Sequence, residues 1–316
     1  KLTKEGPELS VIGFGAWAIG GPWQWGWGEA DETEAIRAIQ CAIDLGVNWI
    51  DTAAVYGFGR SEEIVGKAMK GRREQVFIAT KCGLRWKSDS AVYNDISPES
   101  IRYEVEKSLK RLNIDAIDLY QIHWPSANQS EVRAVQELQR LKKEGKIRWV
   151  GVSNFSVNLM QQCLKSTSFD SLQPPYSLLQ RDIENSELSF CRQNNIGVLA
   201  YSPMYSGLLS GRFDRSKLAP DDWRARDEMF NEPKLSANLQ IVENLRSIAD
   251  EYGATVGQMA VAWVLHQTAI TSAIVGARTA AQVKENVRAA DCIISEQHMQ
   301  KIEKICATMQ VKNSSH

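Results

Sequence analysis

The stretch NWIDTAAVYGFGRSEE, residues 48–63, joins the end of a short strand, a tight turn and the start of a helix. Strand-forming residues precede Asp51, and Tyr56 follows in a turn that two glycines can bend. We expect Ser61 to cap the helix that begins with EEIVGKAM. A carboxylate and a phenol at the exit of a strand suggest acid–base chemistry. Taken alone, they fit equally well an aspartate that bonds its own turn and a tyrosine that only packs.

The same succession of strand and helix repeats along the chain. Short, nearly continuous apolar segments alternate with segments whose apolar residues share one helical face. Apolar strands that alternate with helices indicate a parallel sheet covered by helices. Eight such units in 316 residues favour a closed (β/α)8 barrel, the TIM barrel, over an open doubly wound sheet. The predicted strands cover residues 12–17, 47–51, 76–81, 117–124, 147–155, 171–176, 196–203 and 270–277.

Three further segments stand outside these units. Residues 2–3 and 9–11 flank a Gly-Pro turn and are predicted to pair as an N-terminal β-hairpin. Two helices are surplus to the minimal barrel. One is among the two that precede the last strand, near residues 235–252 and 255–267, and the other begins at Ser295. A long polar loop at 204–234 interrupts the alternation and is a candidate gate over a bound ligand. The alternative is that its Gly207 and Gly211 serve turns alone.

The composition is that of a globular chain with almost no net charge. Hydrophobic residues make up 43% and charged residues 24%, and no linker divides the chain, so we expect one domain over residues 1–316. The net charge is −1 and Lys and Arg are scattered, which argues against nucleic acid or a membrane surface as the main partner. Six dispersed cysteines, no signal peptide and no apolar run of roughly 20 residues favour a cytoplasmic protein.

Polar residues recur at the exits of the predicted strands. In a (β/α)8 barrel, the side chains at the carboxyl ends of the strands meet at one end and form the active site. We therefore expect a site where the exits of strands two to eight converge, at Asp51, Lys81, His123, Ser153 with Asn154, Gln173, Tyr201 and Gly276.

Four of the expected side chains suggest a mechanism of proton transfer. Free tyrosine is a weak acid with a pKa of about 10, and a neighbouring ammonium lowers that pKa. We expect Tyr56 to donate a proton to a carbonyl oxygen, with Lys81 tuning it and Asp51 as the counter-ion of the lysine. His123 would donate a hydrogen bond that orients the same oxygen. Taken singly, the first two charges fit an ordinary ion pair and the histidine fits a core residue.

At this point several motifs resemble those of the aldo-keto reductases, in particular the branch of bacterial enzymes and potassium-channel β subunits. They are NWIDTAAVYG, IATK, QIHWP, GVSNF, YSPMYSGLLSG and IVGARTAAQVKEN, and they span about residues 10–305 in the family's order. The resemblance implies an NADPH-dependent carbonyl reductase with an (α/β)8 barrel. It also implies the catalytic tetrad Asp51, Tyr56, Lys81 and His123, in agreement with the chemistry above.

The resemblance further implies where NADPH binds. Ser153, Asn154 and Gln173 would bond the nicotinamide carboxamide, and Tyr201 would stack on the nicotinamide ring. The loop 202–209 would cover the pyrophosphate, with the implied contacts Ser202, Pro203, Met204, Gly207 and Leu208. The adenosine end would be held by Gly276, Ala277, Arg278, Gln282, Glu285 and Asn286.

The segment around Arg278 also suits an anion on physical grounds. Thr279-x-x-Gln282 is predicted to be a capping box, so the helix that follows offers a partial positive charge at its start. Arg278 beside it suits a ribose 2′-phosphate, which favours NADPH over NADH. The alternative is an exposed arginine next to an ordinary helix cap.

Tryptophans are concentrated in GAWAIGGPWQWGWG, residues 15–28. Aromatic rings at the mouth of a barrel can stack on a sugar or an aromatic ring and exclude water. We expect Trp17, and Trp124 directly after the strand-four histidine, to line the substrate pocket. The roles of Trp23, Trp25 and Trp27 stay open, because packing the loop against the barrel is an equally good use of them.

Two other patterns carry no function. Gly13-x-Gly15-x-x-Ala18 loosely matches a dinucleotide fingerprint, but the Gly-Gly-Pro that follows breaks the helix that the fingerprint needs. We interpret it as the exit of the first strand. The four histidines have no metal-ligand spacing, so we predict no metal site.

The sequence thus predicts a cytoplasmic NADP(H)-dependent reductase that acts on a small aldehyde, a ketone or a sugar-derived carbonyl. One alternative is a regulatory module that binds the cofactor, like the potassium-channel β subunits. Another is a barrel hydrolase or isomerase without nicotinamide, which would leave residues 276–286 unexplained. The physiological substrate, the preferred direction and the oligomeric state are not decided by the sequence.

Overall fold

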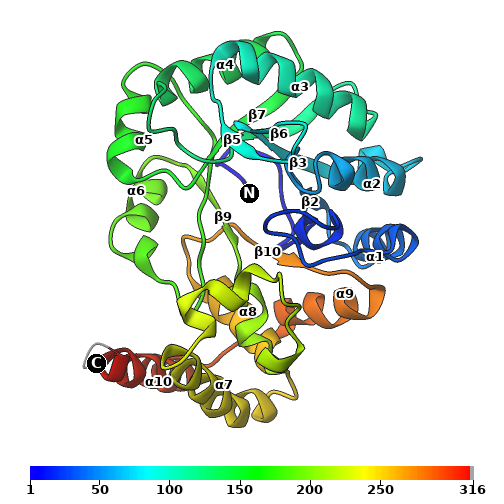
Figure 1. Cartoon of the computed structure of the whole chain (residues 1–316). Helices are drawn as coiled ribbons and strands as arrows, with labels where there is room; N and C mark the ends of the chain where they lie inside the picture. The colour runs from blue at the N-terminus through cyan, green and yellow to red at the C-terminus, as the bar shows by residue number, and fades with distance from the viewer. Residues whose placement is uncertain (314–316) are drawn as a thin grey trace.

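The computed structural model describes the backbone of residues 1–313 and shows a closed barrel of parallel strands (Figure 1). Strand β1 pairs with β2 on one side and with β10 on the other, which closes the sheet. This confirms the predicted (β/α)8 barrel. The barrel strands are β1 (Ile12–Gly15), β2 (Trp49–Asp51), β3 (Phe77–Cys82), β6 (Ile117–Ile122), β7 (Ile147–Ser153), β8 (Ser171–Gln173), β9 (Gly197–Tyr201) and β10 (Ser272–Gly276).

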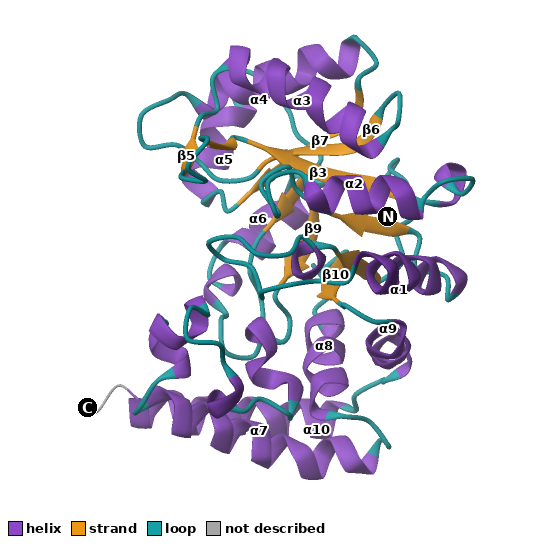
Figure 2. Ribbon diagram, turned by 45° about the vertical axis from the view of Figure 1, so that its right-hand side comes forward, coloured by secondary structure: helices purple, strands orange, loops and turns teal. Residues whose placement is uncertain are grey.

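Helices surround the barrel. Eight of them follow the strands: α1 (Glu32–Asp44), α2 (Arg60–Ala68), α3 (Pro98–Leu112), α4 (Glu131–Lys143), α5 (Val157–Leu164), α6 (Glu187–Gln193), α8 (Val256–His266) and α9 (Ala280–Val287). The two predicted extra helices are α7 (Lys234–Glu251) and α10 (Glu296–Asn313), which pack side by side outside this ring (Figure 2). None of the described helices is both long and apolar enough to span a membrane.

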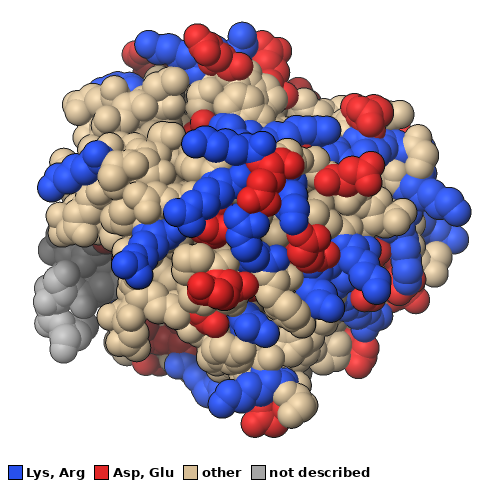
Figure 3. Space-filling view, turned by 90° about the horizontal axis from the view of Figure 1, so that it is seen from above, with Lys and Arg blue, Asp and Glu red and all other residues tan. Residues whose placement is uncertain are grey.

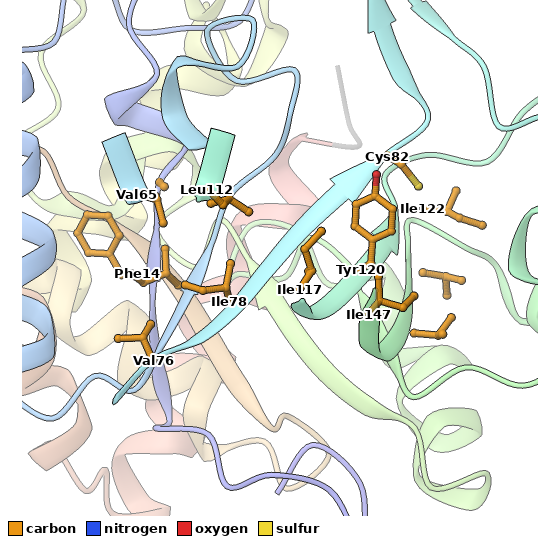
Figure 4. Packing of buried hydrophobic residues seen from close by; sticks show 14 of the residues in the cluster. Phe14, Val65, Val76, Ile78, Cys82, Leu112, Ile117, Tyr120, Ile122 and Ile147 are labelled. Atoms are coloured by element: carbon orange, nitrogen blue, oxygen red, sulfur yellow. The ribbon is translucent and has the colours of Figure 1, made fainter. Parts of the chain in front are cut away.

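Alternate residues of the strands face the two sides of the barrel wall. Ile78, Tyr120 and Ile122 point outward and pack under the helices (Figure 4). Trp49 and Leu119 belong to a cluster on the inner side. Because both faces are buried, the strands read as continuous apolar runs in the sequence, which is why their positions were predictable.

Glycine in β1 serves the packing of the barrel interior. A Cβ atom on Gly13 would lie 2.1 Å from the Trp49 ring, so the indole occupies the space that a larger residue would need. Only a short 3-10 turn, Trp17–Ile19, follows the strand. This supports the interpretation of the Gly13-x-Gly15 pattern as a strand exit rather than a nucleotide fingerprint.

The N-terminal segment differs from the prediction. The structure describes all of residues 1–11, and none of them belongs to a strand, so the expected β-hairpin is wrong. A turn closed by the bond from the Leu2 N–H to the Pro7 carbonyl, at 2.9 Å, takes its place. Leu2 and Leu9 are buried together with Trp49 inside the barrel. The segment therefore plugs the barrel, and burial of its two leucines decides its conformation.

The start of α2 also differs from the prediction. The helix is preceded by Gly59, whose φ is 101°, and Ser61 does not act as the cap. Ser61 is fully buried, and its hydroxyl donates to the Ala16 carbonyl at 2.8 Å and bonds the Thr52 hydroxyl at 2.8 Å. Ser61 thus ties the exits of β1 and β2 to the helix, a tertiary role that the local pattern does not reveal.

A small antiparallel hairpin after β3 was not predicted. It consists of β4 (Leu84–Trp86) and β5 (Val92–Asn94). The buried Glu104 of α3 accepts the Gly83 N–H at 3.0 Å and so holds the turn that leads into this hairpin. The other oxygen of Glu104 has no hydrogen-bond partner among the described residues. Burial raises the pKa of Glu104 from 4.5 to about 8, so this carboxyl is mostly protonated at neutral pH.

The surface carries charges of both signs. On the face seen in Figure 3, Lys and Arg side chains lie among Asp and Glu side chains. The formal net charge of the whole chain is −1.

Glu104 makes the stability of the fold depend on pH. A group whose pKa is raised by folding contributes stability that is full below its unfolded pKa, here 4.5, and is lost as the pH rises through 8. Within this window we expect Glu104 to lower the free energy of unfolding by about 1.4 kcal/mol per pH unit. In Glu104→Gln, the free energy of unfolding should not show this fall with rising pH. Urea unfolding of the wild type and of the variant at several pH values tests the prediction. If the free energies of unfolding of the two proteins change with pH in parallel, the prediction is contradicted.

Candidate active site

The predicted strand-exit residues meet at one end of the barrel, around a cavity of about 580 Å³. Residues from seven of the eight barrel strands or their exits contribute to its lining, among them Gly15, Asp51, His123, Ser153, Gln173, Tyr201 and Gly276. Lys81 does not line this cavity, because it lies beneath the other side chains and is only 1% exposed. The convergence that the sequence predicted is therefore present in the fold.

Lys81 joins three groups at the centre of the site. Its Nζ lies 2.6 Å from Asp51 Oδ2, 2.9 Å from the Thr52 carbonyl and 3.2 Å from the Tyr56 hydroxyl. All three acceptors come from β2 and the turn after it, whereas the lysine comes from the neighbouring strand β3. The ammonium is thus fixed directly beside the phenol.

Burial controls the protonation states of Lys81 and Tyr56. Burial lowers the pKa of Lys81, and the charge of Asp51 opposes that effect. The pKa of Tyr56 lies well above its usual value, first because the hydroxyl is buried and second because Asp51 disfavours a second negative charge. The expected net lowering of the Tyr56 pKa is therefore wrong for this structure, because the net shift is upward. The hydroxyl stays protonated at neutral pH, which a proton donor requires.

His123 stands beside the same tyrosine. The two ring centroids are 5.6 Å apart and the rings meet edge to face, at 76°. Burial, and then the nearby charge of Lys81, hold the pKa of His123 well below its usual value. The imidazole is therefore neutral at neutral pH, and its remaining N–H can donate a hydrogen bond.

The residues predicted to bind the nicotinamide end form one hydrogen-bonded chain. Asn154 Oδ1 accepts from the Tyr201 hydroxyl at 2.9 Å, and its Nδ2 donates to Ser153 Oγ at 3.0 Å. Ser153 Oγ donates to the Gln173 carbonyl at 2.8 Å, and Gln173 Nε2 donates to Asp51 Oδ1 at 2.8 Å. The chain links β7, β8 and β9 to the lysine–aspartate pair, so the two predicted groups of side chains are positioned together.

The residues predicted to bind the adenosine end line a second cavity of about 360 Å³. They are Gly276, Ala277, Arg278, Gln282, Glu285 and Asn286. Trp27, Met204 and Gly276 line both cavities, so the two adjoin. The sequence did not single out Arg212, which lines the second cavity and bonds Glu285 at 2.9 Å. Its position at the end of the motif YSPMYSGLLSGR was the available signal.

The start of α9 is capped in part as predicted. Thr279 Oγ1 accepts the Gln282 N–H at 3.3 Å, but Gln282 Oε1 accepts the Arg278 N–H at 2.7 Å instead of closing a reciprocal box. The Arg278 guanidinium bonds the carbonyl of Glu29. Arg278 therefore connects the adjoining cavity to the loop before α1.

Some residues of the loop after β9 line the larger cavity, and another anchors the loop to the protein. Ser202, Pro203, Met204 and Gly207 line the larger cavity. Leu208 lines neither cavity; it is fully buried with Phe230 and Leu235 and anchors the loop.

Among the described residues, no group of three or more His, Cys, Asp or Glu could hold a metal ion.

Tryptophans form much of the cavity wall. Six of them line it: Trp17, Trp23, Trp25, Trp27, Trp124 and Trp223. The predicted pocket residues Trp17 and Trp124 are among these, whereas Trp223, from the loop 204–234, and Leu84, from the β4–β5 hairpin, were missed. Neither of those two belongs to a strand–helix unit, so the barrel pattern gave no reason to place them at its mouth.

Comparisons with known proteins agree with this geometry. The family model described as "Aldo/keto reductase family" matches residues 11–307. The aldo-keto reductase YhdN of Bacillus subtilis is 41% identical over 287 residues, which cover 90% of this chain and 86% of that protein. The NADH-specific methylglyoxal reductase of Escherichia coli is 39% identical over 301 residues, which cover 91% of this chain and 92% of that protein.

A solved structure is similar over nearly the whole chain. The glycerol dehydrogenase AKR11B4 from Gluconobacter oxydans superimposes with a TM-score of 0.88 and is 38% identical in sequence. The match covers 96% of this chain and 93% of that one.

The lysine–aspartate pair generates a prediction on stability. Lys81→Met leaves the Asp51 carboxylate buried without its counter-ion, so we expect the free energy of unfolding to fall by about 3–5 kcal/mol. The double variant Asp51→Asn/Lys81→Met should recover most of that loss, since no lone charge remains. The matched control is Lys67→Met, because Lys67 bonds Glu32 at the surface, at 2.6 Å; we expect it to cost less than about 1 kcal/mol. A double variant as unstable as Lys81→Met, in urea unfolding, would contradict the prediction.

Proposed function

Because this chain belongs to the aldo/keto reductase family, we propose that it reduces an aldehyde or a ketone to an alcohol with a hydride from NADPH. The observation that carries the proposal is the contact of the protonated Tyr56 hydroxyl with the Lys81 ammonium, at 3.2 Å, on the wall of the larger cavity. A proton donor held beside a cation, in a site shielded from water, is what carbonyl reduction needs.

The chain's own residues then have distinct roles. The bound cofactor supplies the hydride that the carbonyl carbon receives. Tyr56 donates its hydroxyl proton to the carbonyl oxygen as negative charge develops there. Lys81 stabilises the phenolate that remains, and Asp51 holds the ammonium in place. Neutral His123 donates a hydrogen bond to the same oxygen and thereby orients the carbonyl.

The two adjoining cavities suit the two ends of the cofactor. Ser153, Asn154 and Gln173 offer amide and hydroxyl groups to the nicotinamide carboxamide, and Tyr201 offers a ring for stacking. Met204 of the loop 202–209 lines both cavities, and we propose that this loop covers the pyrophosphate. The side chains of the second cavity would hold the adenosine end. Trp17 and Trp124 are proposed to line the substrate end.

Two arginines at the second cavity favour NADPH over NADH. Arg278 and Arg212 both line it, and a guanidinium suits a phosphate better than a neutral hydroxyl. The name of the Escherichia coli relative specifies NADH, so the choice between the two cofactors is a proposal for this chain.

We propose the cytoplasm as the location of the protein. The six free cysteines of the chain agree with the reducing conditions there.

Tyr56→Phe tests the proposed reaction. Without the hydroxyl, we expect kcat for a reactive aldehyde to fall by about 10²–10⁴-fold, because only the proton donor is lost. The affinity for NADPH, from quenching of tryptophan fluorescence, should stay nearly unchanged. Tyr103→Phe, at an exposed position of α3, serves as the control. Tight NADPH binding without turnover in the wild type would favour a regulatory module over a reductase, and absence of NADPH binding would refute both.

Arg278→Gln tests the cofactor preference. A charge-assisted bond to a phosphate contributes about 1.5–3 kcal/mol, so the Kd for NADPH should rise by roughly ten-fold or more. The Kd for NADH in the same variant is the internal control and should change little, because NADH has no 2′-phosphate. Arg133→Gln, on the exposed side of α4, controls for loss of a positive charge. Equal losses of affinity for NADPH and NADH would overturn the assignment.

A further inference from the structure

We propose that Glu104 is a positioning residue for the reaction: its protonated carboxyl holds the turn at Gly83, and its ionisation favours release of that turn. The turn joins β3 to the β4–β5 hairpin, which contributes to the wall of the larger cavity. Glu104 itself lies on α3 and lines neither cavity. The inference rests on the proposed reductase function and adds a control of the same site by pH.

The turn at Gly83 depends on the carboxyl of Glu104. This side chain is buried, and its Oε1 accepts the Gly83 N–H at 3.0 Å and the Ser100 hydroxyl at 3.3 Å. Among the described residues, Glu104 is the only acceptor of this N–H. Gly83 has a φ of 93°, and a Cβ atom at this position would lie 2.7 Å from the side chain of Ile96. The turn is therefore tightly packed, and a single carboxyl satisfies its backbone N–H.

The same turn is bonded to the backbone of His123. The carbonyl of Cys82, one residue before Gly83, accepts the His123 N–H at 2.9 Å. The His123 carbonyl accepts a hydrogen bond from Asn154 Nδ2 at 3.0 Å. The backbone of His123 is thus held between the turn and Asn154. Displacement of the turn would therefore shift the imidazole that we propose to orient the carbonyl.

The hairpin transmits the position of the turn to the cavity. The Asp95 N–H donates to the Gly83 carbonyl at 3.0 Å, which closes the base of the hairpin. Leu84, directly after the turn, lines the larger cavity and packs against the apolar cluster that contains Tyr56. Release of the turn would thus loosen the packing around the proposed proton donor.

The charged groups closest to Glu104 do not neutralise a carboxylate there. Its Oε2 has no hydrogen-bond partner among the described residues. Arg85 of the hairpin attracts a negative charge on Glu104, whereas Asp95 repels it, and these two groups lie 4.0 Å from each other. Burial outweighs all of these influences. An ionised Glu104 would therefore be a buried charge without a counter-ion of its own.

The neighbouring groups on the other elements are neutral or already paired. Cys82 of β3 and Tyr120 of β6 lie side by side, as Figure 4 shows, and burial raises the pKa of both well above the usual values. Glu62 of α2 and Arg111 of α3 both influence Tyr120, and they pair with each other at 2.6 Å. None of these groups offers a free positive charge to Glu104.

Ionisation therefore favours an open form in which water reaches the carboxylate. Burial raises the pKa of Glu104 from 4.5 to about 8 in the closed form, whereas exposure to water restores the ordinary value. The ratio of open to closed molecules should rise about ten-fold per pH unit between these two values and level off above the higher one. The range in which the turn loosens thus includes neutral pH.

A pH profile of turnover tests the effect on the reaction. With NADPH and 4-nitrobenzaldehyde, kcat/KM of the full chain is measured from about pH 6 to pH 9 for the wild type and for Glu104→Gln. The glutamine keeps an acceptor for the Gly83 N–H and cannot ionise. We expect the ratio of wild-type to variant kcat/KM to fall by at least about three-fold over this range. Titration of Lys81 is common to both proteins and cancels in the ratio.

A second carboxyl on the same helix provides the matched control. Glu106 of α3 is exposed and bonds Lys146 at the surface. Glu106→Gln removes a carboxyl without touching the turn, so it should keep the wild-type pH profile. A ratio of wild-type to Glu104→Gln kcat/KM that stays constant with pH would overturn the proposal, and so would the same change of profile in both variants.

Hydrogen exchange tests the opening itself and needs no turnover. The protection of the Gly83 and His123 amides is measured by NMR in the wild type and in Glu104→Gln. Between about pH 6 and pH 8, we expect wild-type protection to fall by about ten-fold per pH unit relative to the variant. It should also stay below the protection that corresponds to global unfolding in urea. Equal pH dependence in the two proteins, or opening only by global unfolding, would overturn the proposal.

Failure of the reductase function is distinguishable from failure of this inference. If NADPH binds and no carbonyl compound is turned over, the proposed function is wrong, and the exchange experiment still decides whether Glu104 holds the turn. Turnover combined with pH-independent protection of Gly83 would support the reductase and overturn the role of Glu104.

Discussion

The buried ion pair between Lys81 and Asp51 is the contact on which the other interactions of the site depend. Either charge alone inside the barrel would carry a large desolvation cost. Pairing requires β2 and β3 to be adjacent and in register, and Asp51 stands opposite Ala79, two residues before the lysine on the same inner face. The 2.6 Å contact is therefore possible only when the two strands have paired. Once it forms, the ammonium reaches the Tyr56 hydroxyl without further adjustment.

The closed barrel extends this pair into one connected network. Gln173, on the far side of the barrel, donates to the second oxygen of Asp51, so strands β2, β3 and β8 share a single polar cluster. Close packing beneath the cluster depends on a small residue. A Cβ on Gly151 would lie 2.6 Å from Ser171 Oγ and 2.7 Å from Gln121 Cγ. Strands thus hold the polar groups of the candidate site, in accord with the role of scaffold elements in precise sites.

Segments outside the barrel pattern form the wall in front of this network. The loop before α1 supplies most of the tryptophans, the loop after β9 supplies Trp223, and the β4–β5 hairpin supplies Leu84. These segments are held by contacts distant in sequence, such as the one between Arg278 and the Glu29 carbonyl. A barrel of this kind supports many chemistries, because the strands position the reacting groups while the loops decide what can approach them.

The barrel, the two extra helices and the residues at the strand exits could all be predicted from the amino-acid sequence. Strand and helix periodicities are local, and the exit of a strand can be located without knowing its partners. The conformation of the N-terminal segment, the partners of Ser61 and the places of Trp223 and Leu84 were decided only by the tertiary structure. Each depends on contacts between distant parts of the chain. The same holds for the raised pKa of Tyr56, because desolvation is set by every segment that covers the hydroxyl, whereas the sequence shows only which charge lies nearby.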